Sequence, residues 1–320
     1  MKINYSLKSV RRIIGFSIVF LLFFFMAKSL YQNWNKIPFE KIRFNYYYLA
    51  ISFIPLLFCF PIGAFAWKYI LNNLGEKIFF RRAAGIIAIS QLGKYLPGKI
   101  WFAVGRIYLA KVGGICGSKT LVSLLLETGM LFISSLILFL ISAIGITNLA
   151  IPHLLILSAI ITIIGLVGLY PTIFSKILNF FLSLFRRKKI EIYFPYGRIL
   201  LLLIIYGIAW LLYGLGFYLL INSFYPVAFS SLLYLTAVYA ISWNIGFIIL
   251  ISPAGLGVRE GVLSSLLQSQ FPQPITIIIA FLSRIWITIG ELIFLIIAVK
   301  WGIEVKRYGK EEKAEERKEG

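Results

Sequence analysis

Two polar, basic stretches interrupt a sequence that is otherwise strongly apolar. The first, Ser90–Arg106, reads SQLGKYLPGKIWFAVGR and carries three cations around a Pro-Gly dipeptide; the second, Ser252–Gly261, reads SPAGLGVREG and ends in an Arg-Glu pair before its last glycine. A straight helix cannot run through either stretch, because proline lacks the backbone N–H and glycine loosens the chain. We therefore predict two broken helical elements, over residues 83–111 and 253–271. The backbone breaks are predicted at Pro97, Gly98, Pro253, Gly255 and Gly257.

Charged side chains in and beside these elements are the candidate functional residues. An unpaired charge at the bilayer centre is costly, so each must pair with another group or face water. Arginine offers a fixed fork of donors that suits phosphate oxygens, and lysine supplies a mobile point charge. The cations predicted to bind a phosphate-containing lipid headgroup are Lys94, Lys99, Arg106, Arg259 and Arg284. The predicted counter-ions or coupling acids are Glu127, Glu260 and Glu291.

Two further features support a pocket, and one alternative stays open. A helix that restarts after each break presents free backbone N–H groups and the positive end of its dipole to an anion. Arg284 and Glu291 are seven residues apart, which places them on one face of a helix. The alternative is that these charges are structural ion pairs that hold helices together.

The composition indicates a membrane protein. Of the 320 residues, 60% are hydrophobic and only 14% are charged, whereas a soluble domain is about a quarter charged. The mean hydropathy is +0.90, and several apolar runs are longer than the roughly 18 residues that a hydrocarbon core requires. We therefore expect an all-α polytopic integral membrane protein.

The formal net charge of +20 does not indicate nucleic-acid binding in such a chain. The basic residues cluster at the ends of apolar segments, where they anchor helices and orient the chain. Attraction to anionic lipid headgroups is the electrostatic role that fits this distribution.

About eight membrane segments are expected, in a single integral membrane domain over residues 1–301 with a charged cytoplasmic tail over residues 302–320. The first segment, Ile13 to about Ala27, follows four cations and is interpreted as a retained helix rather than a cleaved signal peptide. The distribution of Lys and Arg predicts that both termini are cytoplasmic and that the protein is multi-pass in the cell (cytoplasmic) membrane.

The two broken elements leave the topology partly open. We expect the element at 83–111 to be a re-entrant hairpin that enters from the cytoplasm, although two tilted short crossings would give the same sidedness. The element at 253–271 is expected to cross outward; if it returned instead, the C-terminus would face outside. A weak internal likeness between the elements, each with proline and small residues before an arginine, suggests an internal repeat.

Other chemistry finds little support in the residue types. His153 is the only histidine, so metal sites rich in histidine are excluded and histidine acid–base catalysis is disfavoured. Cys59 and Cys116 lack C-x-x-C spacing and are interpreted as inert buried thiols. We predict no metal, no cofactor and no catalytic residue, and the chain is more in keeping with a binding or transport protein than with an enzyme.

The two polar stretches resemble a known family. QLGKYLPGKIW followed by Gly-Arg, and PAGLGVREG followed by an apolar helix, are similar to the two hallmark stretches of the lysylphosphatidylglycerol synthase transmembrane-region family, also called flippase-like. The family pattern more often has glycine where this chain has Ala254. Its bacterial multiple peptide resistance factors join such a module to an aminoacyl-transferase domain, which a chain of 320 residues has no room for.

The resemblance implies a stand-alone membrane module that binds and translocates a phospholipid or lipid-linked headgroup between leaflets. It also implies a membrane phospholipid or lipid-linked substrate as partner, and a separate lipid-modifying enzyme is compatible with it, as is an oligomer. Three alternatives stay open: a membrane enzyme or accessory factor for lipid-linked glycan or aminoacyl-lipid synthesis, an ion-coupled transporter of small solutes, and a scaffold for cell-envelope enzymes.

Overall fold

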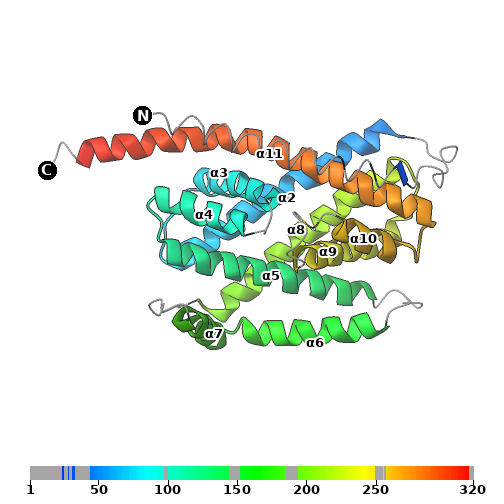
Figure 1. The fold of residues 1–320 in the computed structure, drawn as a ribbon, viewed down its shortest axis with the longest axis horizontal. Coiled ribbons are helices and arrows are strands. Elements are labelled where there is room, and N and C mark those ends of the chain that lie inside the picture. Colours follow the sequence, from blue (N-terminus) through cyan, green and yellow to red (C-terminus); the bar gives the residue numbers. More distant parts are fainter. Residues whose placement is uncertain are drawn as a thin grey trace.

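The computed structural model describes residues 24, 28, 31–32, 44–96, 100–143, 152–184, 194–248, 255 and 257–316. These residues form helices and their connections, with no strand among them, which confirms the all-α prediction (Figure 1). The helices are α2 (Tyr46–Asn73), α3 (Phe80–Gln91), η3 (Leu92–Tyr95), α4 (Trp101–Val112), α5 (Gly117–Ala143), α6 (Pro152–Gly168), α7 (Pro171–Leu184), α8 (Tyr196–Asn222), η4 (Phe229–Ser231), α9 (Leu232–Ile248), α10 (Val258–Leu267) and α11 (Gln273–Glu316).

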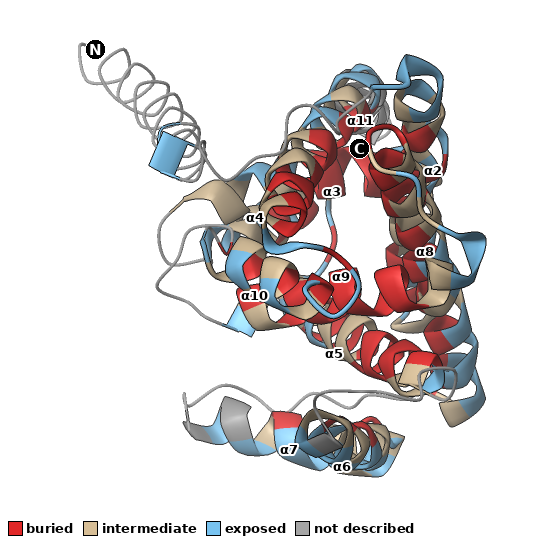
Figure 2. Ribbon diagram, turned by 90° about the vertical axis from the view of Figure 1, so that its right-hand side faces the viewer, coloured by how far each residue is buried: buried red, intermediate tan, exposed pale blue. Residues whose placement is uncertain are grey.

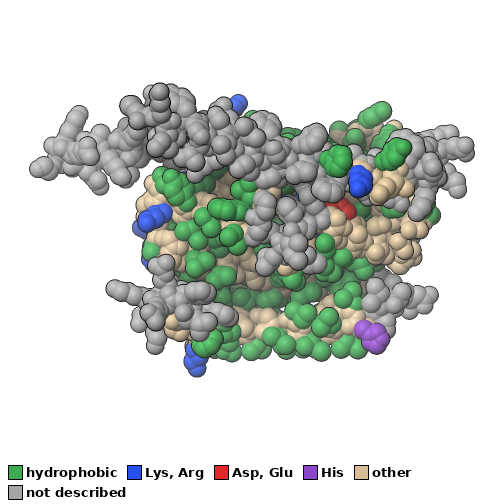
Figure 3. Space-filling view, in the orientation of Figure 1, with side chains coloured by type: hydrophobic (Ala, Val, Ile, Leu, Met, Phe, Trp, Pro, Cys, Tyr) green, Lys and Arg blue, Asp and Glu red, His purple; other side chains and the backbone are tan. Residues whose placement is uncertain are grey.

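Five helices in the described part are long and apolar enough to cross a membrane: α2, α5, α8, η4 with α9, and the Gln273–Lys300 part of α11. A sixth span results if α6 and α7, which meet at an angle of 87°, count as one. Hydrophobic side chains also spread over the described part of the molecular surface in Figure 3, where charged side chains are few. These features fit a multi-pass membrane protein.

The described residues do not confirm the predicted count of about eight segments. The first predicted segment lies outside the described residues except for Phe24. The element at 253–271 contains only the ten-residue α10, which at about 1.5 Å per residue covers roughly half of the hydrocarbon thickness. Helix α10 therefore cannot cross the membrane by itself.

The element at 83–111 is a helical hairpin, hereafter hairpin 1, made of α3, η3 and α4. The two arms run antiparallel: the Arg82 guanidinium donates a hydrogen bond to the Gly113 carbonyl at the base, and Gly93 lies against the backbone of Trp101 and Phe102 near the tip. This arrangement agrees with the predicted hairpin. The membrane face from which it enters stays a prediction.

The element at 253–271 forms hairpin 2 together with α9. Near the tip, Gly246 of α9 lies beside Arg259 of α10, and near the base the Tyr234 hydroxyl lies 2.6 Å from the Ser269 hydroxyl. Helix α10 thus returns along α9 to the end of the bundle where α9 begins, and α11 starts from that end. The chain direction is the predicted one, although the return is a short arm of a hairpin rather than a span.

The two hairpins enter the bundle from opposite ends, as their contacts with the two parts of α11 show. Its beginning lies beside the base of hairpin 2, where the Ser264 and Thr276 hydroxyls are 2.7 Å apart. Further along, Phe294 and Ala298 pack in one apolar cluster with the first arm of hairpin 1. The hairpin tips therefore meet between these two contacts, near the middle of the apolar part of α11 (Figure 1).

Small residues allow close helix packing in the centre of the bundle, as is common in membranes. Buried residues face inward from α2, α3, α5, α8 and α9 (Figure 2). A Cβ added at Gly216 of α8 would lie 2.9 Å from the Ser52 carbonyl oxygen of α2 and 2.7 Å from the Trp286 ring of α11. Gly207, on the same helix, has no neighbour within 4 Å of such an atom.

We expect Gly216→Val to destabilise the bundle and Gly207→Val to leave it nearly unchanged. The added side chain at position 216 must displace the backbone of α2 or a buried tryptophan, and overpacking of this kind costs about 1–3 kcal/mol. Thermal unfolding of the purified protein in detergent, followed by tryptophan fluorescence, measures the difference. Equal melting temperatures for the two variants would contradict this packing.

Candidate functional site

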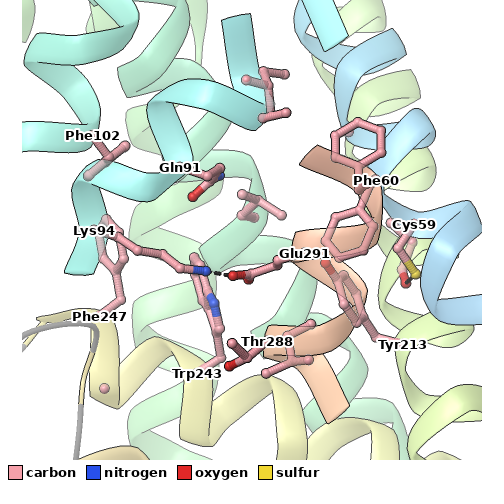
Figure 4. Close-up of a pocket in the computed structure, with 18 of the residues that line it drawn as sticks. Cys59, Phe60, Gln91, Lys94, Phe102, Tyr213, Trp243, Phe247, Thr288 and Glu291 are labelled. Atoms are coloured by element: carbon pink, nitrogen blue, oxygen red, sulfur yellow. Dashed lines mark hydrogen bonds and ion pairs between the residues drawn. The ribbon is translucent and has the colours of Figure 1, made fainter. Parts of the chain in front are cut away.

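A cavity of about 330 Å³ lies where the hairpin tips meet. It is lined by residues of α2, α5, α8 and α11 as well as by both hairpins, and its volume is at the lower end of the range for ligand pockets. Figure 4 shows side chains from several helices converging on this space. All four described cations of the predicted site line the cavity: Lys94, Arg106, Arg259 and Arg284.

The first charged group in the cavity joins the tip of hairpin 1 to α11. The Lys94 ammonium forms an ion pair with one oxygen of Glu291 (Figure 4). The Tyr95 hydroxyl donates a hydrogen bond of 2.7 Å to the other oxygen. Both oxygens of this carboxylate are therefore engaged, and the short helix η3 presents Lys94 and Tyr95 together because they are adjacent in sequence at the end of the first arm.

The second group lies deeper and is fully enclosed. Arg106 of α4 is 1% exposed and forms an ion pair with Glu127 of α5. Its Nε donates to the Ser90 hydroxyl at 3.3 Å, and its guanidinium carbon lies 5.3 Å from the centre of the Trp67 ring. The Arg106 guanidinium therefore contacts a carboxylate, a hydroxyl and an aromatic ring. These contacts are what we expect of an Arg106–Glu127 pair that holds α4 and α5 together.

The third group joins hairpin 2 to α11. Nε of Arg284 lies 3.8 Å from Oε1 of Glu260. The other oxygen of Glu260 accepts a 2.7 Å hydrogen bond from the backbone N–H of Gly257, so the same side chain caps the start of α10. Arg284 and Glu291, on one face of α11, therefore each hold one hairpin.

Arg259 differs from the other described cations. It is 6% exposed, and no carboxylate of the described residues lies within ion-pair distance of it. Its guanidinium stacks over the Tyr239 ring at 4.7 Å. Among the described residues, Nη2 of Arg259 and the hydroxyl of Tyr239 are both buried without a hydrogen-bond partner.

Glycines shape the backbone around Arg259. Gly255 and Gly257 have φ values of +74° and +77°, a left-handed conformation that favours glycine and is compatible with the breaks predicted at these two residues. A Cβ at Gly246 would lie 2.8 Å from Cβ of Arg259. Pro97, Gly98, Lys99 and Pro253 lie outside the described residues, so their predicted roles stay predictions.

The aromatic wall of the cavity was not predicted. Three aromatic residues that line the cavity recur at every fourth position of α9: Tyr239, Trp243 and Phe247. This spacing places them on one helix face, so the aromatic wall could have been predicted from the sequence. The Phe247 ring contacts the Phe102 ring of hairpin 1, with centroids 6.0 Å apart. The ion-pair partners were also unpredicted, because the residues in each pair come from different helices.

Comparison with known proteins gives one finding. The family model described as Lysylphosphatidylglycerol synthase TM region matches residues 12–294, which include both hairpins and the cavity. Neither the curated proteins nor the solved structures gave a match.

A double-mutant cycle tests whether Arg106 and Glu127 act as a structural pair. Removing either partner leaves the other charge buried and unpaired, which costs about 3–5 kcal/mol. We therefore expect Arg106→Met and Glu127→Leu each to lower the stability of the detergent-solubilised protein strongly, and the double variant to recover most of the loss. Strictly additive effects in thermal unfolding would exclude direct coupling between the two side chains.

Proposed function

The chain belongs to the lysylphosphatidylglycerol synthase TM region family, and we propose that it binds the headgroup of a membrane lipid in the cavity and moves that lipid between leaflets. Family membership supports a membrane lipid-related role. Translocation is our proposal, and the observation that carries it is the meeting of two hairpins, from opposite ends of the bundle, at one charged cavity.

The surroundings of the cavity suit a lipid more than a water-soluble ion. Charged and hydroxyl groups can satisfy a headgroup, while the aromatic wall and the apolar outer surface suit acyl chains that remain in the bilayer. The cavity volume of about 330 Å³ is large enough for a headgroup but not for the acyl chains as well. A ligand of this amphipathic kind would place its polar end between the tips and its chains outside them.

The ion pairs on α11 suggest how such a ligand could pass. The Lys94–Glu291 pair holds hairpin 1, and the Glu260–Arg284 pair holds hairpin 2. Releasing one pair at a time would open the cavity toward one membrane face while the other hairpin stays closed, which is the requirement for alternating access. A headgroup phosphate that competes for Lys94 or Arg284 would trigger this release.

A cavity-filling variant tests the transport route. Gly63 lines the cavity, and a Cβ added there meets no atom within 4 Å, so Gly63→Phe should fill the cavity without disturbing the fold. In proteoliposomes we expect the wild type to speed the movement of a fluorescent phosphatidylglycerol between leaflets, and Gly63→Phe to slow it by about tenfold, equivalent to roughly 1.4 kcal/mol.

Gly207→Phe is the matched control, because Gly207 is equally free of neighbours and does not line the cavity. It should transport like the wild type. Absence of lipid movement in the wild type would contradict translocation, and equal rates in both phenylalanine variants would contradict the cavity as the route.

The membrane orientation is a second part of the proposal. The base of hairpin 1 carries Arg81, Arg82 and Lys111, and the positive-inside rule assigns such an end to the cytoplasm of a cell membrane. The interpretation of both cysteines as inert buried thiols is wrong for Cys116, which is exposed in the connection that follows hairpin 1, whereas Cys59 is buried. Hydrogen bonds from the Ser118 hydroxyl and the Lys119 backbone lower the pKa of the Cys116 thiol, so more of it is the reactive thiolate at neutral pH.

We therefore expect a membrane-impermeant maleimide to label the protein in inside-out vesicles and not in intact cells. Labelling should rise with pH, as the remaining thiol ionises, and should disappear in Cys116→Ser. Cys59→Ser should label like the wild type. Labelling of Cys116 in intact cells would reverse the proposed orientation.

A further inference from the structure

The bent helix pair of α6 and α7 contributes no residue to the lining of the cavity. Helix α6 packs along α5: a Cβ added at Gly165 would lie 2.8 Å from the Ile133 side chain, and one at Gly129 would lie 3.4 Å from the Leu169 side chain. At about 1.5 Å per residue, the 17 residues of α6 cover roughly 25 Å, which is most of the hydrocarbon thickness. Helix α6 can therefore cross the membrane beside α5 without α7.

Helix α7 turns away from this direction. The angle between α6 and α7 is 87°, and α7 begins at Pro171, a residue that suits the first position of a helix. Figure 1 shows α6 running alongside α5, and Figure 2 shows α7 extending sideways from α6. Because α5 is long and apolar enough to span the membrane, a helix perpendicular to it and to α6 lies in the membrane plane.

The contacts of α7 place it near one membrane surface. The Tyr170 ring, directly before α7, contacts the ring of Tyr196, the first residue of α8, with centroids 5.4 Å apart. Tyrosines are enriched at the membrane–water interface. Leu178 of α7 packs in one apolar cluster with Ile70 near the end of α2 and Val122 near the start of α5. Helix α7 therefore lies at the end of the bundle that contains the base of hairpin 1.

The sides of α7 differ in the way that an interfacial helix requires. Leu178 is buried against the bundle, whereas Ile177 and Phe180 are 47% and 62% exposed. Residues three apart are neighbours on a helix surface, so these two form one exposed apolar side. Lys176 and Ser183 are also exposed, and their spacing of seven residues places them together on a polar side. An amphipathic helix in the membrane plane needs both kinds of surface.

The charge of this part of the sequence selects the kind of lipid surface. Residues 152–198 contain one acidic residue, Glu191, and several cations. Cations beside a membrane are attracted to anionic headgroups. The six Lys and Arg residues of this segment are Lys176, Arg186, Arg187, Lys188, Lys189 and Arg198.

We propose that α7 is an in-plane anchor that binds the anionic lipid surface of the leaflet at the base of hairpin 1. Ile177 and Phe180 lie among the upper parts of the acyl chains, and Lys176 lies toward the lipid phosphates. Apolar burial and attraction to anionic lipid both strengthen such binding, so the depth of α7 depends on headgroup charge. The anchor is separate from the cavity, and it holds whether or not the protein moves lipid between leaflets.

Spin labels on the full-length protein test this arrangement in vesicles of phosphatidylcholine and phosphatidylglycerol in equal parts. Each label is attached to one introduced cysteine in a background that carries Cys59→Ser and Cys116→Ser. The labelled positions are all exposed, so the fold should tolerate them: Thr172→Cys, Lys176→Cys, Ile177→Cys, Phe180→Cys and Ser183→Cys.

The expected pattern follows the sides of the helix. The ratio of collisions with oxygen, which concentrates in the bilayer, to collisions with a water-soluble nickel complex should be several-fold higher at Ile177 and Phe180 than at Lys176 and Ser183. A depth that changes steadily from Thr172 to Ser183 would make α7 the second half of a membrane span and overturn the proposal. Few collisions of either kind at Ile177 and Phe180 would show that a second copy of the chain covers this side, which would also overturn it.

Vesicles of phosphatidylcholine alone test the role of headgroup charge. The labels at Ile177 and Phe180 should be shallower there, and high salt should cause the same shift in the mixed vesicles because it screens the attraction. Lys176→Glu should make the difference between the two kinds of vesicle about twofold smaller. A label at Ile164, which is 64% exposed on α6, is the matched control and should keep its depth in both. Equal depths for Ile177 in both would overturn the assignment to anionic lipid.

Discussion

Charge is unfavourable inside an apolar helical bundle unless an opposite charge or a network of hydrogen bonds compensates it, and the position of α11 follows from this constraint. Arg284 and Glu291 lie two turns apart on α11, and each pairs with a residue of a different hairpin. The same two pairs compensate four buried or half-buried charges and fix where the hairpin tips lie. The location of the cavity is therefore a consequence of how the charges are paired.

A break between helices can be predicted from sequence because it depends on local chemistry. Gly255 and Gly257 have the positive φ that favours glycine, and they lie between α9 and α10. The breaks predicted at Pro97, Gly98 and Pro253 lie outside the described residues. The helical class and the membrane setting follow from the composition and the length of the apolar runs. The length of α10 could not be predicted, because the turn that ends it after Leu267 depends on contacts with α9 and α11, such as the bond from the Tyr234 hydroxyl to the Leu266 carbonyl.

The candidate site was predictable as a set of residues and not as a set of roles. Side-chain types near the breaks identified the four described cations and three acids that the structure gathers. Their pairing could not be read from spacing, since Lys94 and Glu291 are 197 residues apart. Whether an internal repeat relates the two hairpins stays a prediction; their antiparallel arms and opposite entry into the bundle are compatible with one.

Arg106 and Arg259 have similar sequence surroundings, but the fold gives them different partners. Both follow a break, both are buried, and both stack over an aromatic ring. Glu127 on α5 forms an ion pair with Arg106. The helix face opposite Arg259, in contrast, carries the Tyr239 ring and no described carboxylate. Two arginines with nearly the same sequence signature therefore have different surroundings: the first has a carboxylate partner, and the second has none among the described residues. The position of one glutamate on a neighbouring helix therefore makes the two arginine sites of the cavity chemically unequal.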